Sequence, residues 1–178
     1  VDGVIGSADY HHIESKLIGE DYRNYEEKYW AKKTFAPSCL IFYLGINKKV
    51  NKLKHHTLFF DADFEQHSTE IYDEKRWPKD PLFYVCAPSK TDPNVAPEGC
   101  ENLFVLMPLA TGLEDTPELR SKYFKLLLNR LESHVEQSLT DNIIVNESYC
   151  LKDFKADYNA YGGNAYGLAN TLSQTAIF

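Results

Sequence analysis

Six histidines are the side chains best suited to metal chemistry, but their spacing matches no common metal motif. Adjacent residues usually point in different directions, so neither adjacent pair is expected to offer two ligands to one ion. No H-x-x-x-H occurs, which would place two imidazoles on one face of a helix. The sequence therefore predicts no metal site and favours structural roles for the six histidines: His11–His12, His55–His56, His67 and His134.

The four cysteines, at positions 39, 86, 100 and 150, form no C-x-x-C pair. Cys39 and Cys86 lie within apolar runs, where a free thiol packs as a small hydrophobic side chain. A reducing compartment explains this usage more simply than a disulfide framework does. There is no G-x-S-x-G elbow, and the carboxylates lie mostly in polar stretches, so the catalytic residues stay unknown.

The most unusual stretch is "YNAYGGNAYGL", residues 158–168. Its composition alone favours a flexible loop that enters a helix. A second interpretation is that the backbone approaches a flat ligand so closely that a Cβ atom would clash. On that interpretation Tyr161, Gly162 and Gly163 would line a binding site.

Composition limits the class of partner. The chain has 178 residues and a net charge of -7 with a pI near 5.4, so it is not expected to bind nucleic acid. A local basic stretch, "KKVNKLKHH" at 48–56, is interpreted first as a solvated turn and second as a contact with anionic lipid headgroups. Hydrophobic residues make up 43% of the chain, which is enough for one domain with a core.

Apolar periodicity and turn residues predict an α+β fold, with a mixed, largely antiparallel sheet and helices on one face. Residues 81–88 and 102–110 form an antiparallel pair around a loop rich in Pro, Asp and Gly. The clearest helix has Thr116 as its N-cap and an apolar stripe beginning at Leu119. The expected strands are 3–9, 38–46, 56–61, 81–88, 102–110 and 142–149, and the expected helices are 10–18, part of 20–36, 116–139 and 150–159, with a short helix or a turn at 68–78.

Several of these segments together resemble the bacterial and fungal type of phytoene desaturase. The pattern is carried by Thr91-Asp92-Pro93, by Ala96-Pro97-Glu98-Gly99 and by the run Val105-Leu106-Met107-Pro108. "HHTLFF" resembles the strand before it, and "DFKADYNAYGGNAYGLANTLSQTAIF" resembles the segment that leads into the last cofactor-binding part. "GSADYHH" is similar to an Asn-Ala-Asp stretch of the family, with Ser7 in place of the usual Asn.

The resemblance implies an FAD-dependent oxidoreductase of the amine-oxidase-like superfamily that removes hydrogens from a carotenoid. It implies that residues 1–18 are a sliver of the FAD-binding domain and that residues 19–178 bind the carotenoid, the last of them leading back to the FAD domain. The family's Gly-rich dinucleotide motif is not in this sequence, so no FAD is expected on this chain alone. The enzyme is expected to be cytoplasmic and peripherally attached to a membrane, and the chain to be an inactive fragment of it.

A tunnel for the carotenoid would explain why the strand at 38–46 is apolar on both faces. We expect Leu40, Phe42 and Leu44 to line the tunnel. The opposite face, with Cys39, Ile41 and Tyr43, is then expected to pack on the helix at 116–139, because Gly45 on that face would let a helix approach closely.

Two alternatives remain open at the level of sequence. The chain could be a non-catalytic module that binds an apolar ligand or a protein with its sheet. Within the family, a carotenoid isomerase or a retinol saturase is also compatible with the resemblance. A Gly-rich dinucleotide motif encoded upstream of Val1 would favour the enzyme, and a start codon just before Val1 would favour the module.

Overall fold

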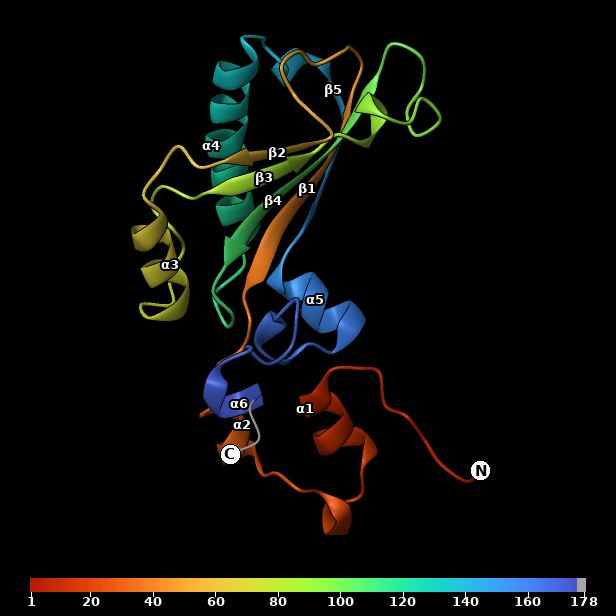
Figure 1. Ribbon diagram of the computed structural model, residues 1–178, viewed down its shortest axis with the longest axis vertical. Coiled ribbons are helices and arrows are strands. Elements are labelled where there is room, and N and C mark those ends of the chain that lie inside the picture. Colours follow the sequence, from red (N-terminus) through yellow and green to blue (C-terminus); the bar gives the residue numbers. More distant parts are fainter. Residues whose placement is uncertain (176–178) are drawn as a thin grey trace.

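Five strands form one sheet in the order β2-β3-β4-β1-β5 (Figure 1). The computed structural model describes residues 1–175. All four neighbouring strand pairs in this part of the chain are antiparallel, which confirms the predicted α+β class. The strands are β1 (Ser38–Ile46), β2 (His56–Phe59), β3 (Phe83–Cys86), β4 (Glu101–Leu109) and β5 (Ile143–Tyr149).

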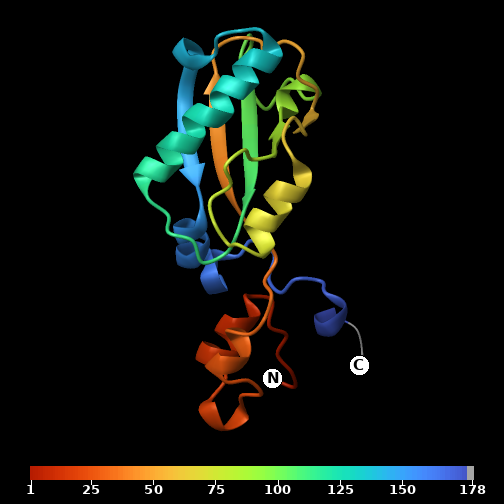
Figure 2. The same ribbon diagram turned by 90° about the vertical axis from the view of Figure 1, so that its left-hand side faces the viewer.

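The two longest helices, α3 and α4, lie on the same side of the sheet (Figure 2). The helices are α1 (Tyr10–His12), α2 (Glu27–Trp30), α3 (Phe64–Tyr72), α4 (Pro117–Val135), α5 (Leu151–Tyr158) and α6 (Leu172–Thr175). Single turns of other helix types are Ile13–Leu17, Glu20–Tyr22, Pro88–Lys90, Thr140–Asn142 and Tyr161–Gly163. The helix predicted at 68–78 thus begins earlier, because the Asp63 side chain accepts a hydrogen bond from Gln66 N and caps it there.

Helix α4 has the predicted start and the predicted apolar stripe. The Thr116 hydroxyl accepts a hydrogen bond from Leu119 N, and Pro117 takes the first helical position. The helix ends at Glu136, whose φ of 53° is left-handed. The stripe packs on the sheet through the buried side chains Tyr123, Leu127, Leu131 and Val135, and Leu119 and Leu126 are partly buried beside them.

The face of β1 that packs on α4 is the opposite of the predicted one. Leu40, Phe42 and Leu44 belong to the buried core that includes the α4 stripe, and the Phe42 and Phe124 rings lie 5.1 Å apart. The expectation that Cys39, Ile41 and Tyr43 face this helix is therefore wrong. Both faces of β1 are apolar, so its own sequence does not say which of them a helix covers.

Gly45 also has a different role from the expected one. A Cβ atom at this position would lie 3.1 Å from Val145 Cβ on the neighbouring strand β5. The β1–β5 register shifts between Gly45 and Ile46, as at a β-bulge. The lack of a side chain at Gly45 therefore lets the edge strand β5 pack closely against β1. It does not make room for a helix.

Residues 1–9 do not contain the predicted strand. Val4 and Ile5 are exposed, and no strand within residues 1–175 pairs with them through ladder hydrogen bonds. The predicted cap is confirmed, because the Asp9 side chain accepts a hydrogen bond from His12 N. The partly helical character predicted for residues 20–36 is also confirmed, by Glu20–Tyr22 and α2.

The N-terminal helices form a separate cluster beyond one end of the sheet (Figure 1). Its centre is Trp30, which is 1% exposed and has the Tyr10 and Tyr29 rings at 5.1 and 5.2 Å. Residues 34–37 and 165–169 run antiparallel between this cluster and the sheet, with Ala36 N and Gly167 O 2.9 Å apart. The chain therefore crosses between the two parts through one pair of adjacent segments.

Candidate functional site

The sheet has one apolar face that no helix of the α3–α4 layer covers. In antiparallel strands, side chains directly opposite each other share a face, so the register defines this set. We name it the open sheet face. It consists of His56 and Leu58 on β2, Tyr84 and Cys86 on β3, Asn102, Phe104, Leu106 and Pro108 on β4, Cys39, Ile41, Tyr43 and Gly45 on β1, and Val145, Glu147 and Tyr149 on β5.

Much of the open sheet face is accessible. Tyr43 is 45% exposed, Leu58 64% and Val145 49%, while Phe104 and Leu106 in the middle of the sheet are half-buried. The end of the face near the start of β1 is closed by α5, whose Phe154 packs edge-on against Tyr149 with the ring centroids 4.9 Å apart. The accessible part therefore runs from β5 across β4 toward β2.

The chemistry of this face suits an apolar ligand. Most of its side chains are aliphatic or aromatic, and its only acidic residue is Glu147. Burial and a hydrogen bond with Cys86 raise the pKa of Tyr84 to about 12, so this phenol stays neutral. Burial also raises the pKa of the Cys39 thiol to about 12, which makes it a poor nucleophile.

The Gly-rich segment, residues 158–168, lies at the end of the sheet where β1 begins. Gly162 and Gly163 have φ angles of 63° and 71°, which favour glycine. Gly162 O accepts a hydrogen bond from Gly112 N at 2.7 Å, and Gly163 O accepts one from Ser38 Oγ at 2.5 Å. These bonds tie the segment to the residues that flank β1 and β4, which is more order than composition alone suggested.

The close approach at Gly163 is to the protein itself. A Cβ atom there would lie 2.7 Å from Leu151 O at the start of α5. Tyr161 and Gly162 instead line a cleft of about 470 Å³ between the N-terminal cluster and the end of the sheet. The Tyr161 ring packs there on His11, with the ring centroids 4.3 Å apart.

The six residues predicted to line substrate are thus not brought together. Leu40, Phe42 and Leu44 lie in the core under α4, Tyr161 and Gly162 line the cleft, and Gly163 is buried against α5. The residues of the open sheet face were missed. Their signal in the sequence is the run at 102–110, in which every residue after Asn102 is apolar, so that both faces of the strand are apolar.

Asp9 is a second residue whose role exceeds the expected one. Its Oδ2 atom accepts hydrogen bonds from Asn164 Nδ2 at 3.1 Å and from Tyr161 N at 3.3 Å. The same carboxylate that caps α1 therefore holds the Gly-rich segment. This contact spans 155 positions of sequence, so no local pattern announces it.

The basic stretch at 48–56 is largely paired within the protein. Lys48 Nζ donates to Ser138 O, Lys49 Nζ donates to Cys100 O, and Lys52 forms a 2.5 Å ion pair with Glu136. These partners support the interpretation as a solvated turn over that of a lipid-binding patch. Among the described residues, no helix combines the length and apolarity that a bilayer crossing requires.

Comparison with known proteins identifies relatives of this chain. The chain is 44% identical over 176 residues to the carotenoid 3,4-desaturase of Haloarcula japonica, an alignment that covers 99% of the chain and 36% of that protein. It is 30% identical to the zeta-carotene-forming phytoene desaturase of Myxococcus xanthus, over 99% of the chain and 34% of that protein. The lycopene-forming phytoene desaturase of Pantoea ananas is 31% identical over 82% of the chain.

No family model matches the chain. The relatives nevertheless agree with one another, and their similarity extends over nearly the whole of it. The chain spans about a third of the length of these curated relatives. Over that third, the chain belongs to the carotenoid and phytoene desaturase family.

Proposed function

We propose that this chain is the substrate-binding part of an FAD-dependent carotenoid desaturase, and that the polyene lies on the open sheet face. The observation that carries the proposal is an accessible apolar face on the central sheet of a chain that is homologous to carotenoid desaturases. Other chemistry of the family, isomerisation included, remains an outcome of the test.

The dimensions and character of this face support the proposal. Strands β1 and β4 each have nine residues, which at roughly 3.3 Å per residue extend roughly 30 Å, and α5 closes the end of this length where Cys39 and Ile41 lie. An extended polyene is long, flat and without hydrogen-bonding groups, so its recognition rests on buried apolar area at roughly 25 cal/mol per Å². Phe104, Leu106 and Tyr43 offer such area in the middle of the sheet.

The substrate would then contact Tyr43, which is exposed, and not the residues first expected. Leu40, Phe42 and Leu44 pack against α4 and are at most 4% exposed, so they offer a ligand little surface. For Tyr161 and Gly162, the cleft beside the N-terminal cluster supports a role at the end of the substrate path nearest the rest of the enzyme.

FAD, which the family assignment implies, does not fit the described residues as its pyrophosphate site. Such a site needs a strand, a Gly-rich turn and a helix N-terminus. Residues 1–9 form no strand, and the helix after them is capped by Asp9, whose carboxylate would repel a phosphate. We propose that parts of a longer protein hold the flavin and accept the hydride.

The boundary toward that flavin part is proposed near residue 36, farther along the chain than residue 18. The supporting observation is the pair of antiparallel segments, 34–37 and 165–169, through which the chain enters and leaves the sheet. The N-terminal cluster with Trp30 would then belong with the flavin side. Limited proteolysis of the longer protein that cuts between 31 and 37 would support this boundary.

Peripheral contact with a membrane is part of the same proposal, because the substrate is apolar enough to reside in a bilayer. Flotation of the longer enzyme with lipid vesicles tests it. Binding to neutral vesicles that does not weaken in high salt is expected, since most lysines of the 48–56 turn already have partners. Failure to float with any vesicle contradicts membrane contact.

The decisive experiment is a product profile of the full-length enzyme with matched variants. Phe104→Ser places a hydroxyl in the middle of the open sheet face, and Phe64→Ser makes the same change at an exposed position on α3. We expect Phe104→Ser to lower turnover at least tenfold or to alter the products, with flavin content unchanged, and Phe64→Ser to do neither.

Equal activity of the two variants would contradict the assignment of this face. The coding sequence upstream of Val1 provides a second test. It should encode a Gly-rich dinucleotide motif, and a start codon directly before Val1 would favour the non-catalytic binding module instead.

A further inference from the structure

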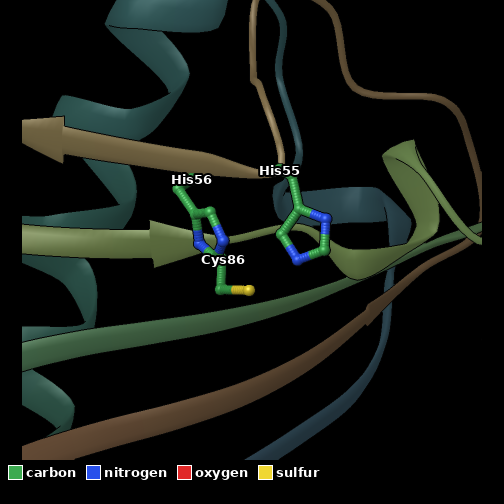
Figure 3. Close-up of side chains that lie close together, drawn as sticks. All are labelled: His55, His56 and Cys86. Atoms are coloured by element: carbon green, nitrogen blue, oxygen red, sulfur yellow. The ribbon is translucent and has the colours of Figure 1, made fainter.

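We propose that His55, His56 and Cys86 form a metal site of the kind that takes Zn²⁺. The three side chains meet where β2 begins and β3 ends, and their potential ligand atoms all lie within 4.8 Å of one another (Figure 3). This end of the sheet is opposite to the Gly-rich segment. The site is independent of the proposed carotenoid chemistry.

The two histidines converge because only one of them belongs to the strand. β2 starts at His56, and His55 lies in the bend before it, so the alternation that separates neighbours in a strand does not apply. His55 O accepts a hydrogen bond from Ala87 N at 2.8 Å, which fixes the bend against β3. Cys86 faces His56 directly in the β2–β3 register.

Hydrogen bonds orient the imidazoles as they do around known zinc sites. His55 Nδ1 lies 2.5 Å from Thr91 Oγ1, and that hydroxyl donates to Pro88 O. Thr91 therefore accepts from His55, which places the ring proton on Nδ1 and leaves Nε2 with a lone pair for the metal. His56 Nδ1 lies 2.6 Å from the Tyr84 hydroxyl, so this ring is also held by a neighbour.

The donor set selects the class of ion. Two imidazole nitrogens and one thiolate sulfur suit Zn²⁺, whose bonds are about 2.0–2.1 Å to nitrogen and about 2.3 Å to sulfur. Ligand atoms around one such ion lie roughly 3.5 Å apart, so small side-chain rotations would close the present spacing. Ca²⁺ and Mg²⁺ are disfavoured because they require oxygen ligands.

Binding would replace the Cys86 thiol proton by the metal and release that proton to solvent. Three protein ligands leave the fourth tetrahedral position for water or another small ligand. Because His56 and Cys86 belong to the open sheet face, that position borders the same surface. The ion would also clip the start of β2 to the end of β3.

The test uses Co²⁺ and Zn²⁺ as probes on the purified, metal-free protein. One equivalent of Co²⁺ should give a thiolate charge-transfer band in the near ultraviolet and tetrahedral d–d bands in the visible. Cys86→Ser should abolish the charge-transfer band, and His55→Gln should weaken Zn²⁺ binding at least tenfold by titration calorimetry. Cys100→Ser and His12→Gln are the matched controls and should change neither signal.

Alkylation with iodoacetamide covers the case in which a variant fails to fold. In the unsubstituted protein, Zn²⁺ should protect Cys86 at least tenfold against modification and leave Cys100, which is also partly exposed, as reactive as before. Absence of the charge-transfer band, its loss in Cys100→Ser, equal protection of both cysteines, or normal Zn²⁺ affinity in His55→Gln would each overturn the proposal.

Discussion

The two faces of the central sheet have similar composition and different surroundings. One face of β1, with Leu40, Phe42 and Leu44, packs under α4, whereas Tyr43 on the other face opens toward solvent beyond the reach of α5. The sequence of a strand therefore shows that one of its faces is apolar, but it does not show what covers that face. The cover can be a helix of the same chain, or, as we propose for the open sheet face, a ligand.

The faces also differ in how their edges are secured. On the covered side, Asp115 before α4 is 2% exposed and binds the Arg120 guanidinium through two 2.7 Å contacts. It also accepts from Lys152 N at 2.9 Å, which joins α4 to α5. A buried ion pair and a hydrogen bond to the α5 backbone thus hold the edge of the covered face together.

Neighbouring residues of β1 give the largest expected contrast. Phe42→Ala leaves a cavity between the sheet and Phe124 and should lower the free energy of unfolding by about 3–5 kcal/mol. Tyr43→Ala, on the open sheet face, should cost about 1 kcal/mol or less. Urea unfolding followed by circular dichroism measures both changes. If Tyr43→Ala proves as costly as Phe42→Ala, the two faces do not differ as described.

The Asp115 contacts should yield the next largest effect. Asp115→Asn removes one of the two carboxylates that pair with Arg120, the other being Asp153, and should cost about 2–4 kcal/mol at neutral pH. Burial alone raises the pKa of Asp115, but the hydrogen bonds from Arg120 and Lys152 N outweigh it and hold that pKa below its usual range. The stabilisation is therefore present above the unfolded pKa of about 3.9 and is lost as the pH falls through the folded pKa.

Unfolding curves of the two proteins measured between neutral and acidic pH check this sign. Their difference in stability should shrink as the pH drops below about 4. Glu98→Gln, a substitution in the exposed loop between β3 and β4, serves as the control and should show a difference near zero throughout. A constant difference down to strongly acidic pH would mean that Asp115 contributes by packing and not by its charge.

What the sequence could predict follows from the range of the interactions involved. The strand at 38–46 and the helix capped by Thr116 were predicted because periodicity and capping are local properties. The strand at 3–9 failed because a strand needs a partner that no local pattern guarantees. The face of β1 under α4 was assigned wrongly because the connection from β4 to α4 determines on which side of the sheet the helix packs. That side is a property of the tertiary structure and not of the β1 sequence.

The candidate site shows the same limit. Gly162 and Gly163 were recognised as unusual, and their positive φ angles agree, but the Leu151 backbone that requires Gly163 lies outside the segment. His55 and His56 were separated by the general rule that adjacent residues point in different directions. The strand was expected to begin at His56, as β2 does, but the direction of His55 in the bend before it depends on contacts with β3 that no local pattern predicts.

The turn that sets the β3–β4 register offers a smaller, sharper test. Gly99 has a φ of 78°, in the left-handed region that favours glycine, and the space around its missing Cβ is empty. Gly99→Ala should therefore cost about 1 kcal/mol from backbone strain alone. Gly163→Ala should cost more, since it adds a clash with Leu151 O to the same strain. Thermal unfolding that ranks them in the reverse order would contradict this account.

The smallest expected effect tests whether the β2 end of the open sheet face stays in solvent or is covered in the longer protein. Leu58 is 64% exposed at the edge strand β2, so Leu58→Ser should change the stability of this chain by no more than about 0.5 kcal/mol. In the longer protein that we propose, bound polyene or a neighbouring segment would cover part of this face. The same substitution should then cost more there, because the transfer of apolar surface from water is favourable only where a cover exists.

Tyr22→Ser, at an exposed position of the N-terminal cluster, controls for general effects of losing an apolar side chain. Equal and negligible costs of Leu58→Ser in the short and the long protein would show that this end of the open sheet face stays in solvent, and would confine the polyene to the strands around β4 and β1.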